Sequence, residues 1–204
     1  MRGDPAAAFE RHRSAIAQQI RADGVTHNLV RPLEGRGTAP AATRPWSLEA
    51  LPLIVDAADW ARIEHGVVQR ARLLGRMLAD VYGAQRLLRE ALLPPALVFR
   101  HSGYLRPLHG VLPAGGMHLH IVAFDVARGP DGRWWVISQR TQSPSGLGYV
   151  LHNRLIVSRL FPEAFRELGV QHIASGYRRL LDTVQAQATE IALRHIGRPL
   201  PNAV

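Results

Sequence analysis

The residues with the clearest capacity for chemistry form a loop of small side chains, Pro144-Ser145-Gly146-Leu147-Gly148, which precedes a segment of helical periodicity. Glycines let backbone N–H groups approach an anion, and a helix N-terminus favours negative charge. The loop is therefore a candidate anion-binding site. The same pattern is also found in ordinary connections between elements, so that alternative stays open.

Two aspartates near an expected hairpin could support a metal ion. Asp125 ends an apolar run, and Asp131 lies in the turn that follows it. Each also has a simpler explanation. Asp131 suits the turn itself, and Asp125 could pair with a neighbouring arginine such as Arg128 or Arg140.

Histidine and cysteine chemistry is more limited. The chain has no cysteine, which excludes disulfides, thiolate zinc ligands and cysteine nucleophiles. His118 and His120 share one face of an expected strand and could bind zinc, but no third ligand is evident nearby.

The basic residues are all arginine, because the 204 residues include no lysine. A net charge of +9 and a pI of about 11.3 favour an anionic partner such as a nucleotide, a nucleic acid or an acidic lipid. Nucleic acid is the least expected, because the arginines are spread along the chain and aromatic residues make up only 6%. No apolar stretch is long enough for a membrane span, so a cytoplasmic protein is expected.

Hydrophobic periodicity predicts an α+β fold with a central β-hairpin and flanking helices. Helices are expected over residues 5–23, from the cap Asp56 to Gly83, over 84–92, after the small-residue loop, and over 177–195. Apolar runs at residues 96–100, 118–126 and 133–138 are read as strands. The last two flank a Gly-Pro-Asp-Gly turn and form the hairpin. Residues 33–45 are read as a linker or surface loop, and 197–204 as a disordered tail.

The hairpin is apolar on both faces, because Trp134 and Trp135 must point to opposite sides of one strand. Strands of this kind normally lie inside a covered sheet. The chain offers few further strands and helices, so we expect an exposed apolar patch or an open sheet edge beside the hairpin.

Three ordered stretches together resemble the circularly permuted ATP-grasp family. Residues 44–52, RPWSLEALP, are similar to its Arg-Pro-Trp-x-Leu-Asp-x-x-Pro segment. Residues 60–70 are similar to its Trp-x-x-(x)-Glu-x-Gly-x-x-Gln-Arg helix, and residues 78–83 continue the match. The most specific stretch, 125–159, contains PDGRWWVI, RTQSPSG, Gly148-Tyr149, Asn153-Arg154 and Arg159.

The resemblance implies a partial, truncated circularly permuted ATP-grasp domain over residues 46–196, preceded by a helix and linker over 1–45. It further implies that the chain is a fragment of an ATP-dependent carboxylate–amine ligase, which would use ATP and Mg²⁺. Members of this family are often linked to alpha-E proteins. The residues that it places on the nucleotide or substrate side are Arg140, Ser145, Gly146, Asn153 and Arg154, with Asp125 as a weak metal contact.

The sequence departs from the family where the metal ligands are expected. One branch has Glu-Asp-Asn six positions before Pro-Ser-Gly, and another has Asp-Arg-Thr-Gln. Here residues 138–141 are Ser-Gln-Arg-Thr, and the family's Glu-Asn-Arg becomes His152-Asn153-Arg154. Because Mg²⁺ prefers charged oxygen ligands, these neutral replacements and the missing lysine predict weak or absent ATP binding by the isolated chain.

We therefore expect a fragment that does not catalyse ligation alone and that depends on a second chain for the rest of the fold. The alternative is a non-catalytic, degenerate module that acts through a protein partner.

Overall fold

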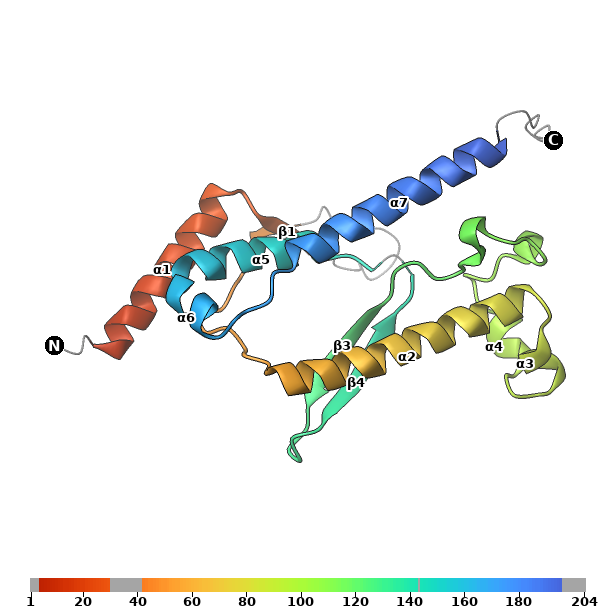
Figure 1. Cartoon of the computed structure of the whole chain (residues 1–204), viewed down its shortest axis with the longest axis horizontal. Helices are drawn as coiled ribbons and strands as arrows, with labels where there is room; N and C mark the ends of the chain where they lie inside the picture. Colours follow the sequence, from red (N-terminus) through yellow and green to blue (C-terminus); the bar gives the residue numbers. More distant parts are fainter. Residues whose placement is uncertain (1–3, 30–41, 143, 196–204) are drawn as a thin grey trace. The chain divides into compact units, whose positions relative to one another are not determined.

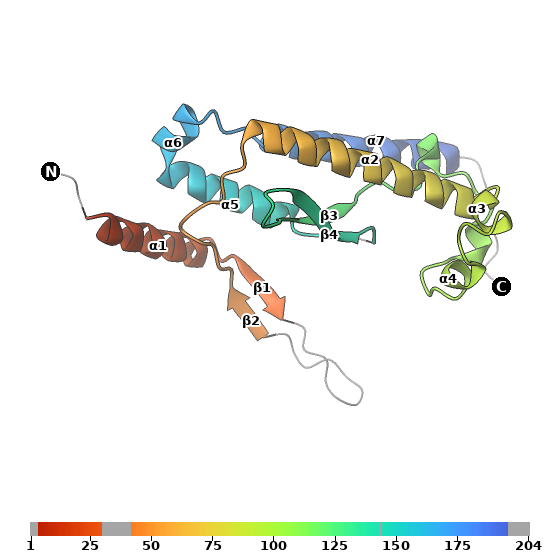
Figure 2. The same cartoon turned by 90° about the horizontal axis from the view of Figure 1, so that it is seen from below.

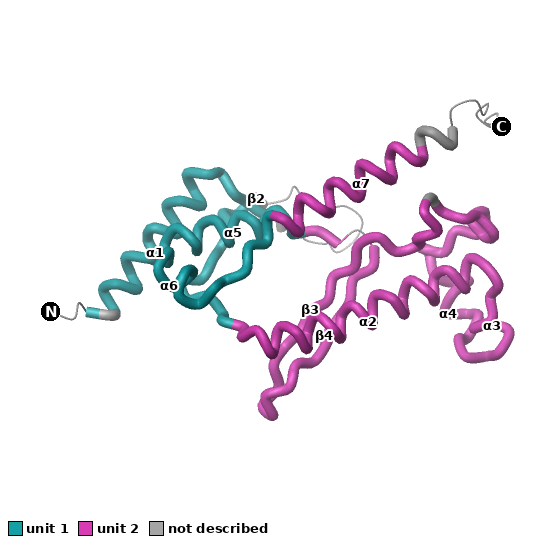
Figure 3. Tube along the Cα trace, in the orientation of Figure 1, with its two compact units in different colours: residues 1–54, 146–174 teal, residues 55–145, 175–204 magenta. Residues whose placement is uncertain are grey.

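A computed structural model describes residues 4–29, 42–142 and 144–195 of the chain. The chain divides into two compact units, residues 1–54 with 146–174 (unit 1) and residues 55–145 with 175–204 (unit 2) (Figure 3). Helices and two small antiparallel sheets confirm the α+β class (Figure 1). The domain boundaries predicted from the sequence stay predictions, and the tail at 197–204 lies outside the described residues.

Unit 1 is built on two helices that bury their apolar faces. It contains α1 (Pro5–Ala22), β1 (Thr26–Leu29), β2 (Ala42–Pro45), α5 (Leu147–Leu160) and α6 (Pro162–Glu167). Asp4 caps α1, because its carboxylate accepts the Ala6 N–H at 3.0 Å. The buried cluster joins Ile16 and Ile20 of α1 to Ile156 of α5 and to Ala50. Burial of these aliphatic side chains stabilises the unit.

The expectation of a loop over residues 33–45 is wrong at its end. Residues 42–45 form β2, which pairs antiparallel with β1 from Thr26↔Pro45 to Leu29↔Ala42. The Trp46 N–H also donates to the Val25 carbonyl at 2.9 Å. The pairing depends on these distant partners, which the local Gly, Pro and Ala composition does not reveal.

Unit 2 is built around the long helix α2 (Ala57–Tyr82). Asp56 caps it through a 2.7 Å bond from the Asp59 N–H, and Gly83 follows its end, so the helix predicted from the sequence is confirmed. The other elements are α3 (Arg86–Arg89), α4 (Pro95–Phe99), η1 (Arg106–Leu108), η2 (Ala114–Gly116), β3 (Ala123–Arg128), β4 (Trp134–Arg140) and most of α7 (Ala174–His195).

The strand expected over residues 96–100 is a helix, α4. Pro95 occupies its first turn, where a proline ring presets the helical φ angle. Four apolar residues are too few to distinguish a helix from a strand by periodicity, and the two prolines before them are the stronger signal.

The predicted hairpin is confirmed, with β3 and β4 antiparallel, and it lies beside α2 (Figures 1 and 2). Its first strand, expected over residues 118–126, begins only at Ala123. Gly132 has φ +76°, and its N–H closes the turn onto the Gly129 carbonyl at 2.9 Å. Among the described residues no other strand pairs with either edge of the hairpin. Trp135 and Ile137 are 51% and 66% exposed. The open apolar edge that the sequence predicts is therefore present in this part of the chain.

Within the described ranges, no helix is both long enough and apolar enough to cross a membrane.

Candidate functional site

The strand where the sequence places a metal ligand carries an ion-pair cluster. Asp125 accepts hydrogen bonds from the Arg140 guanidinium at 3.0 and 2.8 Å and a further one from the Ser138 hydroxyl. Asp125 is paired with Ser138 across the hairpin, and Arg140 follows two residues later, so all three share one face. The Ser138 hydrogen bond, and then the Arg140 charge, hold the pKa of Asp125 below its usual value.

This cluster does not fit a Mg²⁺ site. The carboxylate is already engaged by a guanidinium, and its neighbours bring no further negative charge, whereas Mg²⁺ favours anionic oxygen ligands. Over residues 4–29, 42–142 and 144–195, no three His, Cys, Asp or Glu side chains are grouped to hold a metal. The metal role of Asp125 stays a prediction, and the observed ion pair counts against it.

The two histidines considered for zinc precede β3 and do not lie on a strand, contrary to the expectation, and they have other neighbours. The His118 ring lies nearly parallel to Tyr82, with centroids 6.3 Å apart, and His120 Nδ1 lies 3.0 Å from the Gln187 amide nitrogen. Each ring therefore has a contact that needs no metal.

The small-residue loop leads into α5. Gly146 has φ +112° and no side chain caps the helix that it starts, while Ser145 is exposed. A helix start without a side-chain cap leaves N–H groups that can meet an anion. The local geometry is thus compatible with the predicted roles of Ser145 and Gly146, which no observation tests further.

Asn153 is used within unit 1. Its side-chain oxygen accepts the indole N–H of Trp46 at 2.9 Å, and Tyr149 stacks on the same indole with centroids 4.3 Å apart. The Tyr149 hydroxyl donates to the Thr26 carbonyl at 2.7 Å. Trp46, Tyr149 and Asn153 therefore form a clasp that ties the strands β1 and β2 to α5. Its members come from two of the family-like stretches.

The predicted residues are divided between the two units. Asn153 lies seven residues after Gly146, about 10 Å along the helix axis. Arg154, beside it, lies over the Phe165 ring at 5.6 Å. Asp125 and Arg140 belong to unit 2, and the charge of Arg140 is compensated there by Asp125. Ser145 and Gly146 are consecutive residues at a helix start that has no side-chain cap.

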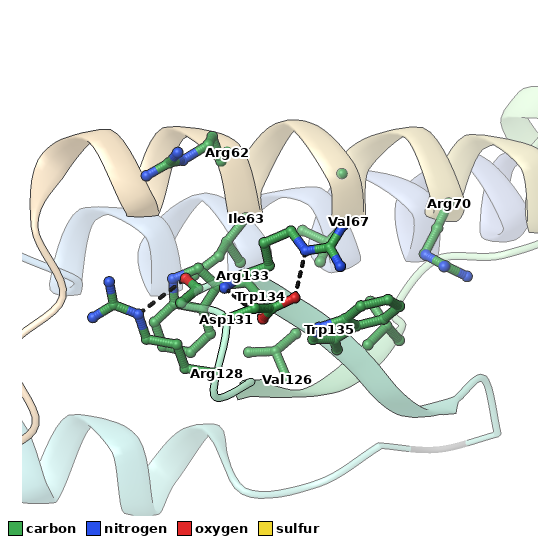
Figure 4. A pocket seen from close by; sticks show the side chains of 13 residues that line it. Arg62, Ile63, Val67, Arg70, Val126, Arg128, Asp131, Arg133, Trp134 and Trp135 are labelled. Carbon is green, nitrogen blue, oxygen red and sulfur yellow. Dashed lines mark hydrogen bonds and ion pairs between the residues drawn. The ribbon is translucent and has the colours of Figure 1, made fainter.

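Sequence reasoning missed a hollow of about 720 Å³ between α2 and the hairpin (Figure 4). Its lining includes four arginines, Arg62 and Arg70 from α2 and Arg128 and Arg133 from the hairpin. Arg62, Gly66 and Arg70 share one helix face, because residues four apart lie on the same side of a helix, but this spacing does not reveal that the hairpin lies opposite.

A buried aspartate holds the wall of this hollow together. Asp59 is 3% exposed and is paired with Arg62 and, at 3.6 Å, with Arg128. The Trp134 indole N–H faces the same carboxylate without meeting full hydrogen-bond geometry. That N–H is the main cause that lowers the pKa of Asp59, and the two arginines add to it. The Asp59 cluster therefore fixes the hairpin against α2.

The rest of the hollow retains positive charge. Arg133 is paired with Asp131 at 2.6 Å and lies over the Trp135 ring at 5.2 Å, as Figure 4 shows. The pairing of Asp131 with its own turn also agrees with the simpler of its two expected roles. Four arginines thus meet two aspartates, Asp59 and Asp131, which leaves an excess of two positive charges beside the two tryptophans.

Comparison with known proteins identifies a family. The sequence profile of the family described as circularly permuted ATP-grasp type 2 matches residues 52–196. The chain is 39% identical over 164 residues to the uncharacterized protein Rv2567 of Mycobacterium tuberculosis, which covers 79% of this chain and 19% of that protein. It is 32% identical over 157 residues to the uncharacterized protein sll0335 of Synechocystis, covering 77% and 32%. A third relative, the uncharacterized protein Rv2411c of Mycobacterium tuberculosis, is 32% identical, with 74% and 28% covered.

The chain therefore spans about a fifth to a third of the length of the curated relatives that it matches.

Proposed function

Because the chain belongs to the circularly permuted ATP-grasp type 2 family, we propose that it supplies the hairpin-bearing part of an ATP-dependent carboxylate–amine ligase. In such ligases ATP activates a carboxylate as an acyl phosphate, which an amine then attacks. The protein's share of this chemistry is to position the reactants and to compensate charge.

The observation that carries the proposal is the cluster of Asp125, Ser138 and Arg140. It lies where the family resemblance expects metal ligands, yet it presents one carboxylate that an arginine already neutralises. We infer that the chain does not ligate by itself. The charged oxygen ligands must come from elements outside the described residues or from a second chain.

The chain's own residues have defined parts in this proposal. The N–H groups at Ser145 and Gly146 receive an anionic group at the start of α5. Asn153 orients Trp46, which directly follows β2. Arg154, held over Phe165, offers its guanidinium to an acidic group.

A second polypeptide that completes the ATP-grasp fold is the partner that we propose. The exposed Trp135 and Ile137 beside the open edge of the hairpin support it, because unpaired strand edges and apolar patches favour association. A polypeptide encoded by a neighbouring reading frame that carries the remaining elements would be the first candidate. The alternative is a non-catalytic module, which the neutralised Asp125 also suits.

The test is metal and nucleotide binding by the full 204-residue chain. Calorimetry with ATP and Mg²⁺ should give no saturation in the low micromolar range. Ser138→Glu combined with Arg140→Asn puts a new carboxylate and an amide on the face of Asp125, and should create a Mn²⁺ site detectable by water-proton relaxation. The matched control, Ser138→Gln with Arg140→Asn, has a side chain of the same shape without the negative charge and should not bind Mn²⁺.

Tight ATP–Mg²⁺ binding by the unmodified chain would contradict the proposal. So would Mn²⁺ binding that is equal in the carboxylate variant and its control, because the ion would then not use this face of the hairpin.

A further inference from the structure

The arginine-lined hollow of about 720 Å³ lies within unit 2, between α2 and the hairpin (Figure 4). Two of its four arginines, Arg62 and Arg128, are both paired with Asp59. A third, Arg133, donates its Nε–H to one oxygen of Asp131 at 2.6 Å and its backbone N–H to the other oxygen at 3.1 Å. Both oxygens of Asp131 are therefore engaged, and the two terminal nitrogens of Arg133 have no acceptor among the residues that the structure describes.

Arg70 is the fourth arginine of the lining, and it is exposed. No carboxylate of the described residues pairs with it, whereas each of the other three arginines has one. Arg70 comes from α2 and Arg133 from the turn of the hairpin, and Figure 4 shows their guanidinium groups apart from each other. A guanidinium group holds a carboxylate through two parallel N–H···O bonds. Two separated guanidinium groups are therefore matched by two carboxylates joined through a short chain, rather than by one compact anion.

The charge of the lining favours a ligand with two negative charges. The four arginines meet two aspartates, which leaves an excess of two positive charges. Asp131 is the single carboxylate among the described lining residues, and none of them is a histidine. Arginine keeps its proton at physiological pH. The pKa of Asp131 is lowered by the hydrogen bonds from Arg133, and the pKa of Asp59 by the Trp134 indole N–H, so the excess charge persists around neutral pH.

Gly66 leaves room in the wall of this hollow. It belongs to the lining and lies one helical turn before Arg70. A Cβ placed on Gly66 would meet nothing within 4 Å beyond its own stretch of helix. Glycine inside a helix is less favourable than alanine, and no close packing requires it at this position. The bare backbone gives a ligand space beside Arg70, and Ile63 and Val67 offer apolar surface for its carbon chain.

We propose that the arginine-lined hollow binds a pair of carboxylates joined by a short carbon chain, one held by Arg70 and the other by the terminal nitrogens of Arg133. A free dicarboxylic acid and a polypeptide segment with two close acidic side chains both present these groups. The site does not depend on the proposed ligase function, because the Asp125 cluster and the loop before α5 take no part in it.

Titration of the full chain with glutarate, followed in ¹H–¹⁵N NMR spectra, tests the proposal. Glutarate should shift the Nε–H signals of Arg70 and Arg133 and the amide signal of Gly66, and these shifts should saturate. Butyrate lacks the second carboxylate and should bind several-fold more weakly. Inorganic phosphate carries its charge on one centre and should also bind there more weakly than glutarate. A capped Asp-Gly-Asp peptide separates the two sources: tighter binding than glutarate identifies a polypeptide segment, and weaker binding identifies a free dicarboxylic acid.

Three substitutions on α2 make the test specific. Arg70→Gln should weaken glutarate binding by about fivefold, as expected for the loss of one exposed ion pair. Its matched control, Arg72→Gln, removes an exposed arginine of the same helix that does not line the hollow and should leave binding unchanged. Gly66→Leu should fill the space beside Arg70 and weaken binding, although leucine favours a helix more than glycine does. Thermal unfolding of this variant should show no loss of stability, so that weaker binding reports the blocked space.

Four results would overturn the proposal. They are glutarate shifts that do not saturate, binding of butyrate or phosphate at this site as tight as that of glutarate, equal weakening by Arg70→Gln and Arg72→Gln, and undiminished glutarate binding by a folded Gly66→Leu variant.

Discussion

The clasp of Trp46, Tyr149 and Asn153 gives a stability prediction that also bears on the role of Asn153. Trp46→Phe keeps a ring for Tyr149 to stack on but removes the 2.9 Å hydrogen bond to Asn153. A buried or half-buried hydrogen bond contributes about 1 kcal/mol, and an oxygen left without its donor adds to the loss. We expect Trp46→Phe to lower the free energy of unfolding by about 1–2 kcal/mol.

Larger and coupled changes sharpen this prediction. Trp46→Ala also removes the ring and should cost about 3–5 kcal/mol. Asn153→Ala should cost about as much as Trp46→Phe. The double variant should cost about 1 kcal/mol less than the sum, because both substitutions remove the same bond. For a chain of this size each kcal/mol corresponds to about 2–4 °C in Tm.

The assay is urea unfolding followed by far-UV circular dichroism, with Trp60→Phe as the control. Trp60 lies on α2, is 47% exposed and makes no side-chain hydrogen bond to the described residues, so the control should change little. If Trp46→Phe costs no more than the control, or if the double variant is simply additive, the clasp does not hold unit 1. Asn153 would then be free for a ligand.

The remaining predictions concern the hairpin, the loop and the apolar edge. Asp59→Asn should lower the urea midpoint at pH 7. Because the folded-state pKa of Asp59 is lowered, its contribution is present above the unfolded-state pKa and is lost as pH falls through the folded one. The gap to the unmodified chain should therefore narrow as the pH falls below the usual pKa of an aspartate, and a gap independent of pH would refute the argument. Phosphate should shift the NMR signals of Ser145 and Gly146, and shifts centred on α2 would exclude the loop. Sedimentation should show self-association that Ile137→Lys reduces, whereas a monodisperse chain that binds no hydrophobic dye would contradict this.

The elements that could be predicted are those whose signals are local. α2 follows from its periodicity and from the cap at Asp56, and the hairpin follows from the turn at 129–132. Both signals act between residues a few positions apart. The family resemblance is also a local signal, because it rests on short sequence motifs rather than on contacts between distant residues.

The features that could not be predicted depend on distant partners. The Trp46–Asn153 bond joins residues 107 positions apart, and β2 exists because residues 26–29 lie beside it. Asp59 has no special signature on its helix, and its role appears only once Arg128 and Trp134 lie opposite. The same holds for the arginine-lined hollow, whose members are scattered in the sequence.

The three aspartates around the hairpin are all paired with arginines, and this pairing determines which ions the hairpin can bind. Asp59 is paired with Arg62 and Arg128, and Asp131 and Asp125 are paired with arginines of β4 and its turn. A cation therefore finds no free carboxylate among these three. Arginine stays charged at any physiological pH, so these pairs do not open by loss of its proton. Charge compensation for an anionic ligand at this hairpin must then come from the excess guanidinium groups themselves. In a family whose members are expected to use Mg²⁺ for that purpose, this is the physical reason to look for the metal ligands away from these three aspartates.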